Sequence, residues 1–227
     1  MLKWGGNHVS PDALGAMARA KFRGHLRELD LSFCGSKGLG REAFQQLAAA
    51  SLPRLEVLDI SIGRLNGGGM AALVTALWLA GLKDLDVTAT NIGDDELAEL
   101  ARLNLPKLER LKLNQNDFGD AGFGALARGP AWPGLKTLEL VVGSSQPDAG
   151  LPPPGPDAAR ALAASTRFPN LEELDLRRVA IGDAGATALA KSAGLSKLKK
   201  LSVTEDQVGS AGKAALQRRF GDGLYLI

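Results

Sequence analysis

The sequence predicts an α/β solenoid, a horseshoe in which parallel strands line the concave face and helices cover the convex face. Three observations predict it: a leucine pattern that recurs along the chain, a second apolar ladder that follows it at a fixed distance, and a globular composition. Of the 227 residues, 45% are hydrophobic and 23% are charged, which is ordinary for a folded domain. The repeats therefore decide the fold class.

The first observation is the motif L-x-x-L-x-L, whose last position also accepts Ile or Val. It occurs as LRELDL at 26–31, LEVLDI at 55–60, LKDLDV at 82–87, LERLKL at 108–113, LKTLEL at 135–140, LEELDL at 171–176 and LKKLSV at 198–203. Successive copies end 26 to 29 residues apart, except for one spacing of 36, and this period is typical of a solenoid. Trp4 lies 27 residues before Leu31, so we expect about eight repeats, the first of them incomplete.

Each repeat should begin with a short strand over the leucine motif and continue through a turn into a helix. A second apolar ladder lies thirteen residues after the end of the motif, at Met17, Leu73, Leu100, Leu126, Leu189 and Leu216. Leu47 and Leu162 join this ladder if three and nine residues are inserted in their repeats. Because one such unit cannot bury its apolar side alone, stacking of neighbouring repeats must supply the core.

The turn between strand and helix carries GDAG at 119–122 and again at 182–185. A glycine-rich turn before a helix can bind a phosphate, but this motif recurs with the repeat and lacks the Lys and Ser/Thr of a P-loop. We interpret it structurally: glycine permits the tight turn, and aspartate accepts backbone amides at the helix start.

Two segments depart from the regular repeat. The 36-residue spacing implies about nine extra residues within VVGSSQPDAGLPPPGPD, whose prolines and glycines favour turns. We expect an exposed loop at about 143–156. The ending GDGLYLI predicts a short terminal strand within a C-terminal cap at about 213–227. The whole chain, 1–227, should form a single domain.

These motifs resemble the ribonuclease-inhibitor-like subclass of leucine-rich repeats, and the wording LDL…IGDAGATALA is similar to bacterial tandem repeats of this class. The resemblance covers nearly the whole chain and implies a binding scaffold. It also implies an Asn, or a Cys, three residues after the motif, where its side chain bonds the backbone of adjacent turns. That position holds Asn7, Cys34, Gly63, Thr90, Asn116, Gly143, Val179 and Asp206. Cys34 is therefore expected to be a buried structural thiol.

Composition and motifs argue against several kinds of function. The 27 basic and 25 acidic residues nearly cancel, which gives no reason to expect nucleic acid binding. No apolar run is long enough to span a membrane, and the N-terminus lacks the layout of a signal peptide, so we expect a cytoplasmic protein without membrane contact. His8 and His25 should face solvent, and no cluster suggests a metal, a cofactor or a catalytic group. We therefore expect no enzyme activity.

The concave face is the candidate binding surface, because the residues between the strand leucines point outward. In the first three complete repeats these positions hold only acids among their charged residues, namely Glu28, Asp30, Asp59, Asp84 and Asp86. Phe33 and Ile62 should be exposed beside them, and the sixth complete repeat offers Arg177 and Arg178 instead. Many bases fall on predicted helices and returns, which predicts an acidic concave half and a basic outer side.

These observations predict a non-enzymatic scaffold that binds a basic protein segment at its concave face, as part of a larger bacterial protein. The chain opens within a strand, which leaves a sheet edge that an upstream segment would cover. A second interpretation is that aspartate is common at this position of such repeats and contributes to solubility. Two other functions stay open: a GTPase-activating or other enzyme-regulating repeat protein, and a purely structural spacer.

Overall fold

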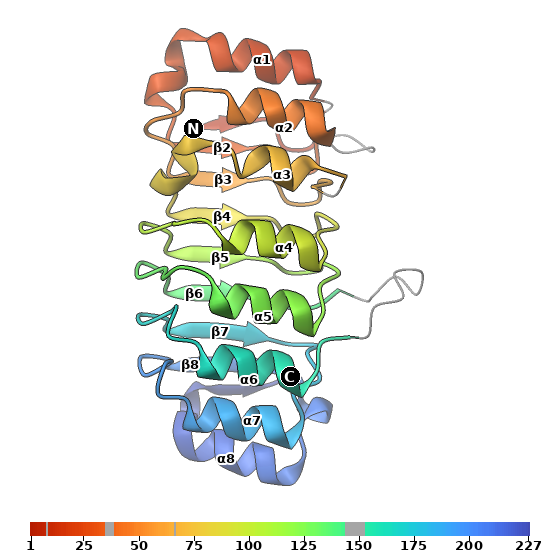
Figure 1. Cartoon of the computed structure of the whole chain (residues 1–227), viewed down its shortest axis with the longest axis vertical. Coiled ribbons are helices and arrows are strands. Elements are labelled where there is room, and N and C mark those ends of the chain that lie inside the picture. The colour runs from red at the N-terminus through yellow and green to blue at the C-terminus, as the bar shows by residue number, and fades with distance from the viewer. Residues whose placement is uncertain (8, 35–38, 66, 144–152) are drawn as a thin grey trace.

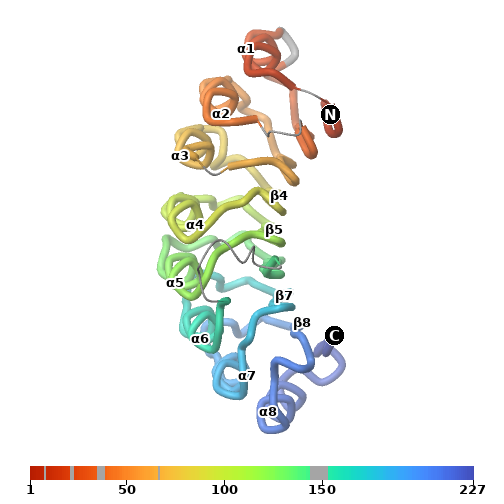
Figure 2. Tube along the Cα trace, turned by 90° about the vertical axis from the view of Figure 1, so that its right-hand side faces the viewer, coloured from red at the N-terminus to blue at the C-terminus, as the bar shows by residue number. Residues whose placement is uncertain are grey.

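The computed structural model describes residues 1–7, 9–34, 39–65, 67–143 and 153–227. These residues form one open sheet of nine parallel strands that follow one another in sequence order. Helices run along one side of this sheet (Figure 1). Figure 2 shows that the stack is curved, with the strands on the concave side and the helices on the convex side. The predicted α/β solenoid is confirmed.

The secondary structure repeats in the order strand, helix, return. The strands are β1 Leu2–Lys3, β2 Glu28–Asp30, β3 Val57–Asp59, β4 Asp84–Asp86, β5 Arg110–Lys112, β6 Thr137–Glu139, β7 Glu173–Leu176, β8 Lys200–Val203 and β9 Leu224–Leu226. The α-helices are α1 Pro11–Arg19, α2 Gly40–Ala48, α3 Gly69–Leu73, α4 Asp94–Ala101, α5 Asp120–Arg128, α6 Pro156–Ala164, α7 Gly182–Lys191 and α8 Ser210–Phe220. Short 3₁₀ helices include η1 Lys21–His25 and η2 Leu77–Gly81 in the returns, and η4 Glu205–Gln207 and η5 Gly221–Gly223 near the C-terminus.

The strand register is the one that the leucine motif predicts. The central leucines of β2 to β8 pair in one row: Leu29, Leu58, Leu85, Leu111, Leu138, Leu174 and Leu201. All of them are buried, as is every member of the second apolar ladder on the helices. The two ladders face each other across one continuous core. Each buried leucine adds about 1.5–3 kcal/mol to stability.

A short strand lies at each edge of the sheet. Lys3 of β1 pairs with Asp30, and Trp4 is half-buried against the core. β9 pairs in parallel with β8 and extends the sheet by one strand. The loop predicted at 143–156 lies mostly outside the described residues, and its last residue, Pro156, is already helical.

The aspartates of the GDAG turns, and Asp94 in the equivalent turn GDDE at 93–96, accept backbone amides at helix starts, as predicted. Asp94 Oδ1 accepts hydrogen bonds from the amides of Gly119 and Gly122, at 2.8 and 2.7 Å, and both amides belong to the next repeat. Asp120 and Asp183 likewise accept amides at the starts of α6 and α8. The helix whose amides are bound is the one in the following repeat, and the carboxylate also lies near the positive end of that helix's dipole.

The glycines of this motif serve close approach more than turn geometry. Gly119 has a φ of −105°, which any residue can adopt. A Cβ on Gly122 would lie 2.5 Å from Asp94 Oδ1, so a side chain there would displace the capping carboxylate. Among the GDAG glycines only Gly182 has a positive φ, at 56°, and there the predicted conformational reason applies.

The position three residues after the motif forms an internal polar spine, as the resemblance implies. Asn116 is fully buried and its Oδ1 accepts the backbone amide of Thr90 at 2.9 Å. Its Nδ2 donates to the carbonyls of Val87 and Leu113, each at 2.9 Å. Thr90 and Asn7 also bond the carbonyl at the end of their own motif. The spine thus ties neighbouring repeats together behind the strands.

Cys34 belongs to this spine, as predicted. Its side chain is buried, and its thiol donates to the carbonyl of Trp4 at 3.4 Å. Burial raises the pKa of the Cys34 thiol above its usual range. Since only the thiolate is a good nucleophile, we expect iodoacetamide to label Cys34 far more slowly in the native protein than in guanidinium chloride. Equal labelling rates in the two states would contradict this structural role.

Two tryptophans, Trp78 and Trp132, pack into the core. Trp132 is fully buried and donates through Nε1 to the carbonyl of Leu103 at 2.9 Å. The guanidinium of Arg167 lies 3.6 Å from the centre of its ring and donates to the carbonyl of Leu126 at 2.8 Å. Burial lowers the pKa of Arg167 to about 10, so the group stays charged at neutral pH. Arg167 therefore closes the C-terminal end of α5, and Trp78 is also buried.

Candidate protein-binding surface

The outward residues of neighbouring strands form columns across the concave face. Asp30, Asp59, Asp86, Lys112, Glu139, Asp175 and Ser202 make one column, and Glu28, Val57, Asp84, Arg110, Thr137, Glu173 and Lys200 make the other. All of these side chains are exposed or half-buried, while the leucines between them are buried. The structure therefore brings the predicted acidic residues together on one surface.

Several aspartates of this surface also hold the turn that follows their strand. Asp30 Oδ1 accepts the amide and the hydroxyl of Ser32, at 3.0 and 2.6 Å. Asp59 does the same for Ser61, and Asp86 accepts the amide of Thr88. This geometry supports the interpretation of these aspartates as part of the repeat framework. One carboxylate oxygen holds the turn, and the charge still faces the concave surface.

The predicted stripe of free carboxylates is shorter than the sequence suggested. Arg110 Nη1 lies 2.8 Å from Asp84 Oδ2, and Lys112 Nζ lies 3.3 Å from Asp86 Oδ2. The next strand thus neutralises the acids of β4, because equivalent positions of adjacent parallel strands are only about 4.8 Å apart. Within the described part of the chain, Glu28, Asp30 and Asp59 have no ion pair. They define the acidic patch.

Phe33 and Ile62 form an exposed apolar ridge beside the acidic patch. Their exposed fractions are 61% and 52%. Phe33 donates its amide to Ser61, and Ile62 donates its amide to Thr88, so the two residues occupy the same place in adjacent repeats. The ridge and the patch together offer one apolar and one negative stripe, side by side.

The backbone of this ridge is strained. Phe33 and Ile62 have φ values of 56° and 54°, in the left-handed region that favours glycine and in which a β-branched residue is an outlier. In the incomplete first repeat the corresponding residue is Gly6, with a φ of 76°. The same left-handed φ recurs at the equivalent residues Ala89, Gln115 and Arg178, so the repeat imposes this conformation, at a cost of about 1–3 kcal/mol for each residue. Sequence inspection predicted the exposure of this ridge and missed its strain.

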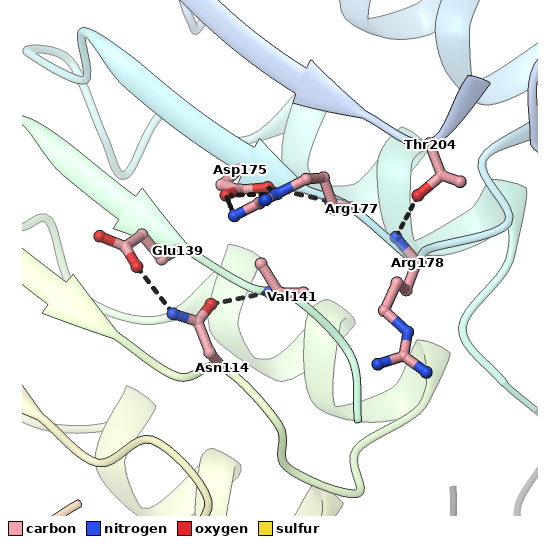
Figure 3. A network of polar contacts seen from close by, with 7 residues as sticks. All are labelled: Asn114, Glu139, Val141, Asp175, Arg177, Arg178 and Thr204. Atoms are coloured by element: carbon pink, nitrogen blue, oxygen red, sulfur yellow. Dashed lines mark hydrogen bonds and ion pairs between the residues drawn. The ribbon is translucent and has the colours of Figure 1, made fainter. Parts of the chain in front are cut away.

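The arginines of the sixth complete repeat differ in their freedom to bind. Arg177 forms a fork with Asp175, with Nη2 2.7 Å from Oδ2 and Nε 3.0 Å from both oxygens. This hydrogen bond raises the pKa of Arg177 further. Arg178 is exposed, and its amide donates to the Thr204 hydroxyl while its side chain extends away (Figure 3). Only Arg178 offers a free charge among these residues.

Asn114 and Glu139 belong to the same surface, next to this pair. Asn114 Nδ2 donates to Glu139 at 2.7 Å, and its Oδ1 accepts the amide of Val141 (Figure 3). A hollow of about 220 Å³ lies between β6 and β9 and includes Glu139, Asp175, Arg177 and Tyr225 in its lining. The hollow is polar, and the ion pairs within it already balance most of its charge.

Acidic and basic side chains lie along opposite edges of the solenoid. This distribution differs from the predicted one, in which the concave half is acidic and the outer side is basic. Acids occupy the first turns of the helices: Asp12, Glu42, Asp94, Asp95, Glu96, Asp120, Asp157 and Asp183. Exposed bases lie in the last turns or the returns: Arg19, Arg54, Arg102, Lys107, Arg128, Lys191, Lys197 and Arg218. All helices run in parallel, so their dipoles favour acids along one edge and bases along the other.

A charge ladder that sequence inspection missed follows the return edge. The second residue of the motif alternates in sign through seven successive repeats: Arg27, Glu56, Lys83, Glu109, Lys136, Glu172 and Lys199. Ion pairs join Arg27 and Lys83 to Glu56, Lys136 to Glu109 and Lys199 to Glu172. Hydrogen bonds from Lys136 and Lys199 lower the pKa values of Glu109 and Glu172. Each exposed ion pair contributes little to the free energy of folding, but the alternation places opposite charges side by side in adjacent repeats.

The structure offers no group that suggests metal or acid–base chemistry among the residues it describes. No cluster of three or more His, Cys, Asp or Glu side chains that could hold a metal ion occurs in that part of the chain. His25 is exposed, as predicted, whereas His8 lies outside the described residues. No helix in the described segments is long and apolar enough to cross a bilayer.

Comparisons with known proteins agree with this architecture. Two family models described as leucine-rich repeat match the chain, one at residues 104–127 and 169–190 and the other at residues 25–47. No curated protein matches the sequence. These matches cover the motif and its helix in three of the repeats.

Solved structures share the fold at low identity. A chain from the complex of Rad7 and Elc1 in yeast is 15% identical, with a TM-score of 0.51 over 92% of this chain and 57% of that chain. A protein from Bacteroides fragilis is 14% identical, with a TM-score of 0.47 over 97% of this chain and 73% of that one. The chain thus spans little more than half of the Rad7–Elc1 relative. At 15% identity the Rad7–Elc1 relative shows a similar fold alone, and the family models identify the matched segments as leucine-rich repeats.

Proposed function

We propose that this leucine-rich repeat solenoid is a non-enzymatic scaffold whose concave face binds a basic segment of a partner protein. One observation carries the proposal: Phe33 and Ile62 are exposed on a strained backbone next to the unpaired acids Glu28, Asp30 and Asp59. Apolar anchors flanked by charge are typical of binding hot spots. The partner segment would place a large apolar side chain on the ridge and Lys or Arg over the patch.

Two further features support a protein-binding role. The related chain from yeast comes from a complex of two proteins, which shows that this fold can be used in protein assembly. The opposite half of the concave face is largely neutralised by its own ion pairs, whereas Glu28, Asp30 and Asp59 in the first repeats form no ion pair within the described residues. Arg178 is a secondary candidate contact. We also propose a ribonuclease-inhibitor-like repeat of bacterial type, in a larger cytoplasmic protein.

The proposed surface can be tested with the pair Phe33→Gly and Ile62→Gly. Glycine adopts the left-handed conformation without strain, so the double variant should fold with a melting temperature close to that of the parent. Peptides selected from a random display library on the parent chain should be rich in Lys and Arg beside large apolar residues. Loss of the two apolar anchors should raise the dissociation constant of these peptides by roughly 30-fold or more. Titration calorimetry measures this change.

The matched control is Gln115→Gly. Gln115 has the same left-handed backbone, with a φ of 56°, and is exposed in the same row, but it is polar. Its replacement should leave peptide binding unchanged. If selected peptides bind the double glycine variant as tightly as the parent, the surface is wrongly assigned. Stimulated GTP hydrolysis by the purified chain would favour the enzyme-regulating alternative, and a library without enriched peptides would favour a spacer.

A further inference from the structure

The return edge of the solenoid carries a row of bases that form no ion pair within the described part of the chain. Arg102, Arg128, Lys191 and Arg218 lie at the C-terminal ends of α4, α5, α7 and α8, and Arg54 and Lys107 lie in returns. All six are exposed. They lie beside the charge ladder, whose four bases all form ion pairs with glutamates. This row makes one edge strongly positive although the chain is nearly neutral.

The same edge carries the most exposed of the large apolar residues described in the structure. Leu77 begins η2, in the return that follows α3, and is 94% exposed. It borders a hollow of about 700 Å³ whose lining is mainly apolar, including Ala48, Leu52, Pro53 and Trp78. None of the lining residues is charged. The hollow lies between the end of α2 and the next return, where α3 stops early at Leu73.

These two features fit one kind of partner. A free polyanion such as a nucleic acid would use the basic row and leave Leu77 and the hollow unexplained. An apolar protein segment would use the hollow and leave the row unexplained. An anionic bilayer surface satisfies both, since its headgroups attract Lys and Arg while apolar side chains enter the boundary of the acyl region. Such a contact needs no membrane-spanning helix.

We propose that the return edge docks the solenoid on an anionic lipid bilayer, with the basic row against the headgroups and Leu77 inserted. This surface is distinct from the concave binding face. With the return edge on the membrane, the concave face stands away from the bilayer and stays open to a protein partner. The absence of a spanning segment, which argued against membranes in the sequence, does not bear on a surface contact.

The experiment is co-sedimentation of the whole chain with two kinds of vesicle, one of phosphatidylcholine alone and one containing phosphatidylglycerol as well. The chain should bind the anionic vesicles and not the neutral ones. Changing Arg102, Arg128 and Lys191 together to Glu should weaken binding by about a hundred-fold or more, at roughly five-fold for each base lost. Leu77→Ser should weaken binding by about ten-fold, and both variants should keep the parent's melting temperature.

A charge-matched triple distinguishes the edge from overall charge. Arg41, Arg64 and Arg160 are exposed on helices or turns away from this row, and their joint change to Glu should leave vesicle binding nearly unchanged. Equal loss for both triples would overturn the proposal, as would an unchanged affinity of Leu77→Ser with equally tight binding to single-stranded DNA. If the Glu triple unfolds, Gln at the same positions serves in its place. The double glycine variant of the ridge should bind vesicles like the parent.

Discussion

Replacing Asn116 by alanine should lower the free energy of unfolding by about 3–5 kcal/mol. The side chain is fully buried and bonds Thr90 of the preceding repeat as well as the carbonyls of Val87 and Leu113. Alanine removes every one of these bonds and leaves the backbone groups buried without partners, at about 1–3 kcal/mol each. Equilibrium unfolding in urea, followed by circular dichroism, measures the loss.

The matched control for this change is Asn104→Ala. Asn104 is exposed in a return, and surface changes of this kind usually stay within about 0.5 kcal/mol. A loss at Asn116 no larger than that at Asn104 would contradict the role of the spine. Because the adjacent spine positions hold Thr90 and Gly143, no neighbouring side-chain amide can replace the missing one.

The second large effect is expected for Gly194→Ala, at about 2–3 kcal/mol of lost stability. A Cβ on Gly194 would lie 2.0 Å from the carbonyl oxygen of Ser165 in the preceding return. The clash is with backbone, which cannot rotate away as a side chain can, so the cost should reach the upper range for overpacked sites. Thermal unfolding of the variant and the parent measures it.

The same substitution at Gly24 provides the comparison. A Cβ on Gly24 would meet nothing within 4 Å, and its φ is not in the left-handed region. Gly24→Ala should therefore be neutral or slightly stabilising, since alanine restricts the unfolded chain. Similar melting temperatures for the two alanine variants would show that the returns of neighbouring repeats are not packed as closely as described. Gly129 and Gly223 approach backbone oxygens in the same way.

The proposed binding surface was partly visible in the sequence. Period-two alternation within the motif placed Asp30 and Asp59 outside and the leucines inside, and the structure agrees. Phe33 and Ile62 follow the motif and are exposed as predicted. The pairing of Asp84 with Arg110 and of Asp86 with Lys112 was not visible, because it depends on which side chains can reach across to the adjacent strand. The acidic stripe therefore shrank to a patch of three residues.

The left-handed backbone of the ridge was also hidden from the sequence. Nothing in the local residue types at Phe33 or Ile62 favours a positive φ, and the repeat imposes it because the chain must leave the strand in the same direction at each level. The alternating ladder from Arg27 to Lys199, by contrast, could have been found by reading the second motif position down the repeats. The alternation in sign is visible only when equivalent positions of successive repeats are compared, and not within a single repeat.

The solenoid, the strand register, the buried ladders and the outward side of each motif residue could all be read from the sequence. These follow from a fixed period, since equivalent residues must occupy equivalent places in a stack. The contacts between repeats needed the three-dimensional structure: Asp94 binds the start of the next helix, and Arg167 lies on Trp132. Local periodicity encodes burial, whereas pairing depends on the lateral distance between repeats and on the reach of each side chain.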